Sequence, residues 1–365
     1  MKNEGLKVML CLLVCVSLLV ATVVCGDSVG LAVSDAVSLL GDMNLDEISI
    51  SVNSVGADER ISSITGYGGG SYASSSAVHS TSADMEALKE QAQKLFENYT
   101  RAGKIKEVQM GATSKTLTLG AVKIDNKTNQ SISIKSLLNT KPSYKKVTKE
   151  EPYILIYHTH STEGYEILDL GWYAKEYNSR TKDTDKNMVR VGDELTKILE
   201  ESGYNVIHDR NIYDESYDGA YSRSRVTVEK YLEKYPSIQI TLDVHRDAIH
   251  YSDGTKCKPT AEINNKKAAQ VMIISGCEGN GVQDFGTWKS NLVFATHLQS
   301  RAEELYPGLM RPVFFCHRKY NMDVTPCSLL LEFGTDANTL EEAVYSAQLI
   351  GDALVEMLDK EIKEK

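Results

Sequence analysis

The sequence has no C-x-x-C pair and no excess of positive charge. It holds 40 Lys and Arg residues against 50 Asp and Glu residues, which gives a formal net charge of −10 and a pI of about 5.4. An acidic chain is a poor candidate for binding nucleic acid through a basic face, so we expect no nucleic-acid partner. Without C-x-x-C pairs, a zinc ribbon is excluded as well. Hydrophobic residues make up 42% of the chain, which is enough for a globular core.

The N-terminus carries one long uncharged run, Val8–Cys25, which follows Lys2 and Lys7. A run of about 18 apolar residues is just long enough to cross a bilayer, and basic residues before it favour an N-terminus on the inner side. A cleaved signal peptide is the alternative, but the run is long for one, and Ala21–Cys25 has no clean small-x-small cleavage site. We therefore predict a membrane anchor at residues 1–26, with the rest of the chain outside the cytoplasm.

Three of the seven cysteines lie in this apolar run. The other four follow it, at Cys257, Cys277, Cys316 and Cys327. Exported cysteines can pair as disulfides or serve as small buried residues, and the sequence leaves both alternatives open.

The region after the predicted anchor is rich in Ser, Gly and Ala. Gly66–Asp84 reads GYGGGSYASSSAVHSTSAD, a composition that is typical of flexible linkers. Met85–Tyr99 then places apolar residues at helical spacing. We predict a linker with one short helix at residues 27–103.

Apolar and polar residues alternate in three short segments that follow the linker. They are Thr116–Leu119, Val122–Ile124 and Ser131–Ile134. Such alternation is typical of half-buried strands. We predict a small β-rich module at residues 104–150.

Residues 151–365 alternate between short apolar runs and segments with helical periodicity. We expect strands at 154–157, 205–207, 238–245, 272–274, 313–315 and 329–331. We expect helices at 185–202, 222–235, 290–305 and 339–360. This alternation predicts an α/β catalytic domain, in which a mostly parallel or mixed twisted sheet carries helices on both faces.

Three of the predicted strands end in residues that can do chemistry. Tyr153–Tyr165 reads YILIYHTHSTEGY, an apolar strand that runs directly into His160 and Glu163. A second strand ends at His245 and a third at Glu332. Ligands of open α/β sheets bind at the carboxyl ends of the strands, and two histidines with one carboxylate form a typical catalytic zinc shell with one open position. We therefore predict a Zn²⁺ site made of His160, Glu163 and His245.

Other residues near these strand ends have alternative roles. Asp185 is a rival third metal ligand, although it can also be the N-cap of the following helix. Glu332 follows an apolar run, so burial should raise its pKa, as a general acid/base requires. Arg246 either binds a substrate carboxylate or oxyanion, or pairs with Asp247. His158 is expected to flank the metal, because side chains two apart in a strand share one side.

Several blocks of the sequence together resemble one family. They are NKTN, IYHTHSTEGY, NMVRVGDEL, LDVHRDA, KKAAQVMIISG and YNMDVTPCSLLLEFGTDANTLEEA. The resemblance is to stage II sporulation protein P, and it covers the chain from about Lys104 to the C-terminus together with the N-terminal anchor. That family resembles the zinc N-acetylmuramoyl-L-alanine amidases, whose motif positions match His160, His245 and Glu332. The amidases place their ligand Glu at the head of a helix, where this chain has Asp185, so the choice between Glu163 and Asp185 stays open.

The resemblance implies a membrane-anchored zinc hydrolase that cuts the N-acetylmuramoyl-L-alanine amide of peptidoglycan, and stem-peptide crosslinks, during engulfment in an endospore former. Glu332 and Arg246 would be its catalytic residues. It also implies two partners, the sporulation membrane protein M and the lytic transglycosylase D of the same stage, and a location between the mother-cell and forespore membranes. Two other functions stay open, a non-catalytic wall-binding scaffold for partner hydrolases and a zinc carboxypeptidase on stem peptides.

Overall fold

The computed structural model describes residues 82–145 and 151–363. The predicted anchor at residues 1–26 and the part of the predicted linker before residue 82 lie outside the described residues. The chain divides into two units, Met1–Tyr72 and Ala73–Lys365, and every described element belongs to the second. Within the two described ranges, no helix combines the length and the apolar character that crossing a bilayer requires.

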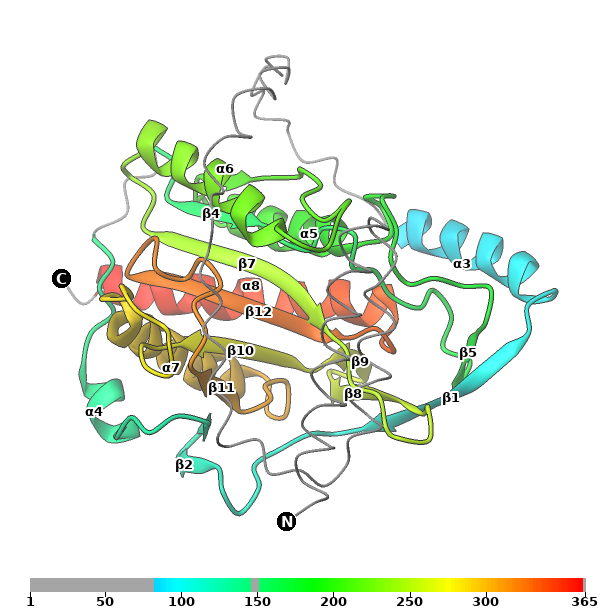
Figure 1. Ribbon diagram of the computed structural model, residues 1–365, viewed down its shortest axis with the longest axis horizontal. Helices are drawn as coiled ribbons and strands as arrows, with labels where there is room; N and C mark the ends of the chain where they lie inside the picture. Colours follow the sequence, from blue (N-terminus) through cyan, green and yellow to red (C-terminus); the bar gives the residue numbers. More distant parts are fainter. Residues whose placement is uncertain (1–81, 146–150, 364–365) are drawn as a thin grey trace, which may run out of the picture. The chain divides into compact units, whose positions relative to one another are not determined.

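Helices and strands alternate along most of the described chain (Figure 1). The helices are α3 (Ser82–Phe96), α4 (Ile134–Asn139), α5 (Met188–Glu201), α6 (Ala220–Lys234), α7 (Trp288–Leu305) and α8 (Leu340–Lys363). The strands are β1 (Arg101–Val108), β2 (Leu117–Leu119), β3 (Val122–Asn126), β4 (Ile154–Tyr157), β5 (Trp172–Ala174), β6 (Val206–His208), β7 (Ile240–Asp247), β8 (Lys256–Ile263), β9 (Lys266–Ala269), β10 (Val271–Gly276), β11 (Val313–Cys316) and β12 (Cys327–Thr335). Each strand and helix predicted between residues 151 and 365 is present, with ends that shift by a few residues.

The main sheet has the strand order β2-β3-β11-β10-β12-β7-β4-β6. The strands β12, β7, β4 and β6 run parallel, and β10, β11 and β3 form a second parallel group. The two groups meet at β10 and β12, which pair antiparallel. The sheet is therefore mixed and mostly parallel, as predicted. All of β4 and β12 and nearly all of β7 are buried, which explains the apolar runs of β4 and β12; β7 alternates between apolar and polar residues and buries both.

Helices cover both faces of this sheet. Successive side chains of β4 point to opposite faces. Ile154 and Ile156 belong to the large core on the face of α5, α7 and α8, whereas Leu155 and Tyr157 form a smaller core with Val228 of α6. On the first face α8 packs against both α5 and α7, and Figure 1 shows α8 running behind β12.

The segment predicted as a separate β-rich module at residues 104–150 does not form a sheet of its own. Strand β1 pairs with β5 and β8 in a second sheet of order β5-β1-β8-β9, while β2 and β3 extend the edge of the main sheet. The third predicted strand, Ser131–Ile134, instead leads into α4, where Ser133 is the N-cap. Local alternation predicts a strand, but the partner of that strand depends on residues far away in the sequence.

The second sheet contains two strands that the sequence does not predict. Strand β8 reads KCKPTAEI, and β9 begins with Lys266 and Lys267. Charged residues and Pro259 are unusual inside a strand, so the segment lacks the ordinary signal. A third strand, β5, lies inside the segment 164–184 that we expected to be a loop throughout.

Candidate active site

Three polar side chains share the face of the main sheet on which α6 lies. Tyr157, which packs against α6, is the register partner of Asp243 in β7. His245 is two residues further along β7 and therefore points to the same face. Glu332 in β12 is the register partner of His245. Because register partners in adjacent strands project to one side, Asp243, His245 and Glu332 lie together.

His160 lies in the loop that follows β4, and only 6% of its surface is exposed. Its Nδ1 is 3.7 Å from Oδ2 of Asp214. Its ring stacks on Tyr217, with ring centroids 4.5 Å apart and an angle of 6° between the planes. The ring of His245 meets it edge to face, with centroids 5.4 Å apart. The two predicted histidine ligands are therefore neighbours.

His245 lies between two carboxylates. Its Nδ1 is 3.4 Å from Oε2 of Glu163, and its Nε2 is 2.8 Å from Oδ1 of Asp243. Burial acts to lower the pKa of His245, but the two carboxylates outweigh burial and raise this pKa well above its usual value. Burial acts in turn to raise the pKa of Glu163, and His245, Arg246 and Arg180 together lower it.

The two threonines of the H-T-H-S-T-E segment hold the aspartates that face the histidines. Thr159 donates from its backbone N and its Oγ1 to the two carboxylate oxygens of Asp243, at 2.8 and 2.7 Å. Thr162 donates in the same way to Asp214, at 3.0 and 2.6 Å. Burial acts to raise the pKa of Asp214, but the nearby imidazole of His160 and the hydrogen bonds from Thr162 outweigh it and lower the pKa to about 2. Each histidine thus has one ring nitrogen facing an anchored aspartate, an arrangement that orients histidine ligands in metal sites.

Glu332 is buried, and its Oε2 has no hydrogen-bond partner among the described residues. Burial raises the pKa of Glu332 to about 8. The charges of Asp247 and Glu163 raise this pKa further, whereas those of His245 and Arg311 oppose the shift. A carboxyl group with a pKa near neutrality can both accept and donate a proton, as general acid–base catalysis requires.

Arg246 is 6% exposed, and its guanidinium is engaged by the protein itself. Its Nε donates to the carbonyl oxygen of Gly164 at 2.8 Å, its Nη1 to that of Asp247 at 3.3 Å and its Nη2 to Oγ of Ser179 at 3.4 Å. Its backbone N donates to Oε2 of Glu163 at 3.3 Å. These bonds tie the loop after β4 to the end of β7. The structure therefore favours a positioning role for Arg246 over the substrate-binding role predicted from the sequence.

Arg180 contacts two carboxylates of the site through its guanidinium. Its Nη1 is 3.0 Å from Oδ2 of Asp214, and its Nη2 is 3.1 Å from Oε1 of Glu163. Its side chain is 35% exposed. The residue comes from the segment between β4 and α5, where Arg180 forms an isolated β-bridge with Glu163. Sequence reasoning missed both Arg180 and Asp214, because a single charged loop residue carries no spacing signal.

Glu163 and Asp185 occupy different surroundings. Asp185 is exposed, and the N-cap of α5 is Asn187 rather than Asp185, because the Asn187 side chain accepts a backbone N–H of the helix. Glu163 is buried, and its carbonyl oxygen accepts the N–H of Met188, the first residue of α5. Glu163 therefore lies at the head of the helix, and it is the carboxylate that the structure brings to His245.

His158 points away from the other site residues, contrary to our expectation. Its Nδ1 is 2.9 Å from the carbonyl oxygen of Val244, and its Nε2 is 2.8 Å from Nε2 of His208. Helix α5 passes so close that a Cβ atom on Gly192 would lie 2.5 Å from both imidazoles. Burial lowers the pKa of both histidines to about 3, so both are neutral. The side-chain alternation of β4 does not continue into the loop after Tyr157.

The structure thus brings together the side chains of His160, Glu163, His245 and Glu332, and Arg246 contacts Glu163 through its backbone N–H. Among residues 82–145 and 151–363, no three His, Cys, Asp or Glu side chains stand in a ready-made metal-binding set. The carboxylate of Glu163 is paired with Arg180 instead. All four cysteines outside the N-terminal run are free and buried.

The sequence model of the family described as "Stage II sporulation protein P (SpoIIP)" matches residues 72–355. The chain belongs to this family. The stage II sporulation protein P of Bacillus subtilis strain 168 is 30% identical over 225 residues, which are 58% of this chain and 53% of that protein. The chain thus spans about half the length of this curated relative.

Two solved amidase structures are similar to this chain at low identity and low TM-score. The N-acetylmuramoyl-L-alanine amidase AmiC2 of Nostoc punctiforme is 12% identical, with a TM-score of 0.34, over 58% of this chain and 97% of that chain. The CwlD amidase of Clostridioides difficile was solved in complex with the GerS lipoprotein. It is 12% identical, with a TM-score of 0.33, over 58% of this chain and 100% of that chain.

Proposed function

We propose that this stage II sporulation protein P family member is a zinc-dependent peptidoglycan hydrolase that cleaves the amide between N-acetylmuramic acid and L-alanine. The observation that carries the proposal is the arrangement around the two histidines. One ring nitrogen of each faces a buried aspartate, Asp214 or Asp243, at 3.7 and 2.8 Å. The other nitrogens, Nε2 of His160 and Nδ1 of His245, are left as potential metal ligands, and Nδ1 of His245 lies 3.4 Å from Oε2 of Glu163.

This donor set fits Zn²⁺. Two imidazole nitrogens and one carboxylate are a common ligand set of catalytic zinc, with one position left open. The aspartates behind the imidazoles are the outer partners that such ligands usually have. His160, Glu163 and His245 would therefore hold the ion, with Glu163 released from Arg180. When bound, zinc would act as a Lewis acid on the amide carbonyl and lower the pKa of water.

Glu332 and Arg246 have separate roles in the proposed reaction, proton transfer and positioning. Glu332, beside His245 and without a hydrogen-bond partner at Oε2, takes a proton from the attacking water and delivers it to the leaving amine. Because Glu332 is buried, its pKa of about 8 lies close to neutral pH, where both steps proceed. Arg246 holds the loop of Glu163 against β7, so the ligands keep their positions. The same apparatus would serve for stem-peptide crosslinks.

The cellular setting is part of the same proposal. The apolar run at residues 8–25 would anchor the chain in a membrane, with the hydrolase domain on the extracytoplasmic side, in the space between the mother-cell and forespore membranes. Membership of a sporulation family supports a role in engulfment. The sporulation membrane protein M and the lytic transglycosylase D of the same stage are the proposed partners.

Mass spectrometry of peptidoglycan digests tests the proposal. The full chain in detergent, loaded with one equivalent of zinc, should release peptides with a free L-alanine N-terminus, and a chelator should stop this release. Released single amino acids would identify a carboxypeptidase instead. Wall binding without any new product would identify a non-catalytic scaffold.

A further inference from the structure

Tyr217 is a highly exposed aromatic side chain that lies beside the buried candidate active site. Its relative exposure is 64%, the highest of the large apolar side chains in the described part of the chain. One face of its ring lies flat on His160, with centroids 4.5 Å apart and an angle of 6° between the planes. The exposed surface is therefore the part of the ring that His160, and the guanidinium of Arg180 that also lies over the ring, leave open. A large ring surface is thus open to solvent directly above a proposed metal ligand.

The loop that carries Tyr217 is held in place on both sides. Arg223 donates from Nε to the carbonyl oxygen of Tyr213 at 2.6 Å and from Nη1 to that of Asp218 at 3.0 Å, and its Nη2 contacts the carbonyl oxygen of Ser216. Within the same loop, Asp214 accepts its two hydrogen bonds from Thr162. The ring is therefore presented by a fixed backbone, which reduces the entropy cost of binding a ligand to it.

Polar groups border the ring. The guanidinium of Arg180 lies 5.5 Å from the ring centroid of Tyr217. Three of its five N–H groups donate to Thr162, Asp214 and Glu163. Two N–H groups therefore remain for an acceptor outside this set, and the side chain is 35% exposed. The surface combines a largely exposed aromatic ring with a guanidinium that lies over it and still has hydrogen-bond donors to offer.

An exposed aromatic ring next to free hydrogen-bond donors suits a sugar ring better than a protein partner. A stable protein partner needs roughly 800 Å² on each side, far more than one ring offers. A hexose ring has about the size of a phenol ring, an apolar face of C–H groups and a rim of hydroxyl groups. Such a ring can stack on Tyr217 while its substituents accept hydrogen bonds from Arg180.

We propose that Tyr217 is the stacking platform for a sugar ring of the glycan strand, and that Arg180 binds an oxygen of that sugar. The proposal rests on the proposed function and adds to it the side of the site on which the glycan lies. The peptide side of the scissile amide would then extend from the metal toward β12. Tyr217 acts on substrate position, so its loss should raise KM and leave kcat nearly unchanged.

Binding of peptide-free glycan tests the proposal independently of hydrolysis. The full chain in detergent is titrated with soluble strands of alternating N-acetylglucosamine and N-acetylmuramic acid that carry no peptide. Tyr217→Ala should weaken binding by about tenfold, the effect of losing one aromatic contact. Tyr217→Phe keeps the ring and should bind like the wild type. Tyr251→Ala removes another exposed tyrosine, one whose ring contacts Lys106, and serves as the matched control.

Three outcomes would overturn the proposal. They are wild-type glycan that does not bind, a Tyr217→Ala variant that binds glycan as tightly as the wild type, and a Tyr217→Ala variant that loses zinc, which would assign the ring to shielding His160. Failure of the proposed function looks different. In that case the wild type binds peptide-free glycan through Tyr217 but releases no peptide from peptidoglycan.

Discussion

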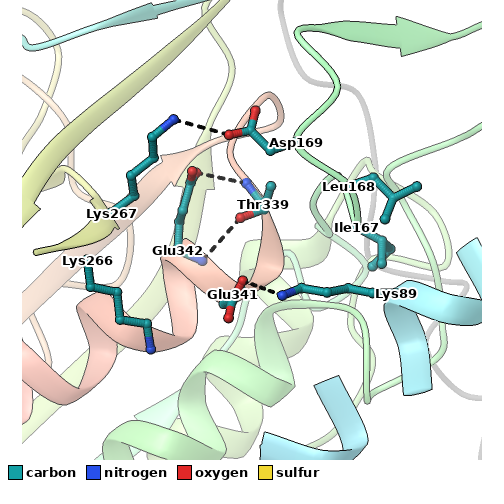
Figure 2. A pocket seen from close by; sticks show the side chains of 9 residues that line it. All are labelled: Lys89, Ile167, Leu168, Asp169, Lys266, Lys267, Thr339, Glu341 and Glu342. Carbon is teal, nitrogen blue, oxygen red and sulfur yellow. Dashed lines mark hydrogen bonds and ion pairs between the residues drawn. The ribbon is translucent and has the colours of Figure 1, made fainter. Parts of the chain in front are cut away.

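Two clusters of buried charge in this protein differ in how their charges are balanced. One is the candidate active site around His245. The other lies at the N-terminus of α8, where Lys258 is 1% exposed and its Nζ lies 2.8 Å from Asp169 and 2.7 Å from Glu342. We call these three residues, together with Lys267, the Lys258 cluster. Figure 2 shows the cavity beside it, about 300 Å³ in volume, into which Asp169, Glu342 and Lys267 project.

The Lys258 cluster satisfies its own charges. Lys267 lies 3.2 Å from Asp169. Oε2 of Glu342 accepts the backbone N–H of Thr339 at 3.1 Å, and Oγ1 of Thr339 accepts that of Glu342 at 3.2 Å, which forms a capping box at the start of α8. Nζ of Lys258 forms no hydrogen bond either, but two carboxylates at 2.8 and 2.7 Å balance its charge, whereas Oε2 of Glu332 in the active site has no partner among the described residues. Burial of charge alone therefore does not identify a site, whereas a buried carboxyl group without a partner beside two histidines does.

The largest effect is expected from removing a proposed metal ligand. His160→Ala and His245→Ala should each abolish stoichiometric zinc and all peptide release, because two donors cannot hold the ion in a catalytic shell. Metal analysis on purified protein checks this result. If both variants retain one tightly bound equivalent of zinc, the two histidines are not metal ligands. The charges around them would then be structural, like those of the Lys258 cluster.

Glu332→Gln tests the carboxyl group that has no partner. The amide keeps the shape and cannot transfer the proton, so turnover should fall by about 10²–10⁴-fold while zinc and wall binding stay intact. Zinc content, melting temperature and peptide release are measured on one preparation. Turnover close to that of the wild type would remove Glu332 from the mechanism.

Lys258→Met tests the balanced cluster. The substitution keeps the aliphatic stem but leaves the buried Glu342 without its cation, so the free energy of unfolding should fall by about 3 kcal/mol, with little from the half-exposed Asp169, which keeps Lys267. Denaturant unfolding of the zinc-free protein measures this. Zinc content and turnover per folded molecule should not change, and a selective loss of activity without loss of stability would contradict the distinction between the two clusters.

The pH dependence of stability sharpens the comparison further. The pKa of Glu332 is raised from 4.5 in the unfolded chain to about 8 in the folded protein, so the folded state binds the extra proton between these values. Its contribution to stability is complete below about pH 4.5 and is lost as the pH rises through about 8. Zinc-free Glu332→Gln should therefore gain stability relative to the wild type on going from pH 5 to pH 9. A constant difference in melting temperature across this range would show that burial does not shift this pKa.

The smallest effects concern the head of α5. Asn187→Ala removes the N-cap and should cost about 1 kcal/mol, whereas Asp185→Ala changes an exposed loop residue and should stay within about 0.5 kcal/mol. Asp185→Ala should also keep zinc, while Glu163→Ala should lose it. If Asp185→Ala lost zinc while Glu163→Ala kept it, Asp185 rather than Glu163 would be the third metal ligand.

Much of the main sheet could be predicted because its central strands carry a local signal. β4 and β12 are buried on both faces and each holds a continuous apolar run that ends at a polar residue, whereas β7 alternates between apolar and polar residues. The strands β8 and β9 of the second sheet carry charged residues, and β8 also a proline, so they give no such signal. For the same reason, the segment 104–150 could be recognised as partly β-structured but not assigned to the sheets it joins.

The sequence by itself determined which residue types lie at the strand ends, and with them His160, Glu163, His245 and Glu332. These follow from periodicity, which is a property of neighbours along the chain. Only the tertiary structure decided that Arg246 ties down a loop, and that Arg180, Asp214 and Tyr217 surround the histidines. These contacts join loops whose positions depend on sheet register and on packing between residues far apart in the sequence, and no local pattern encodes them.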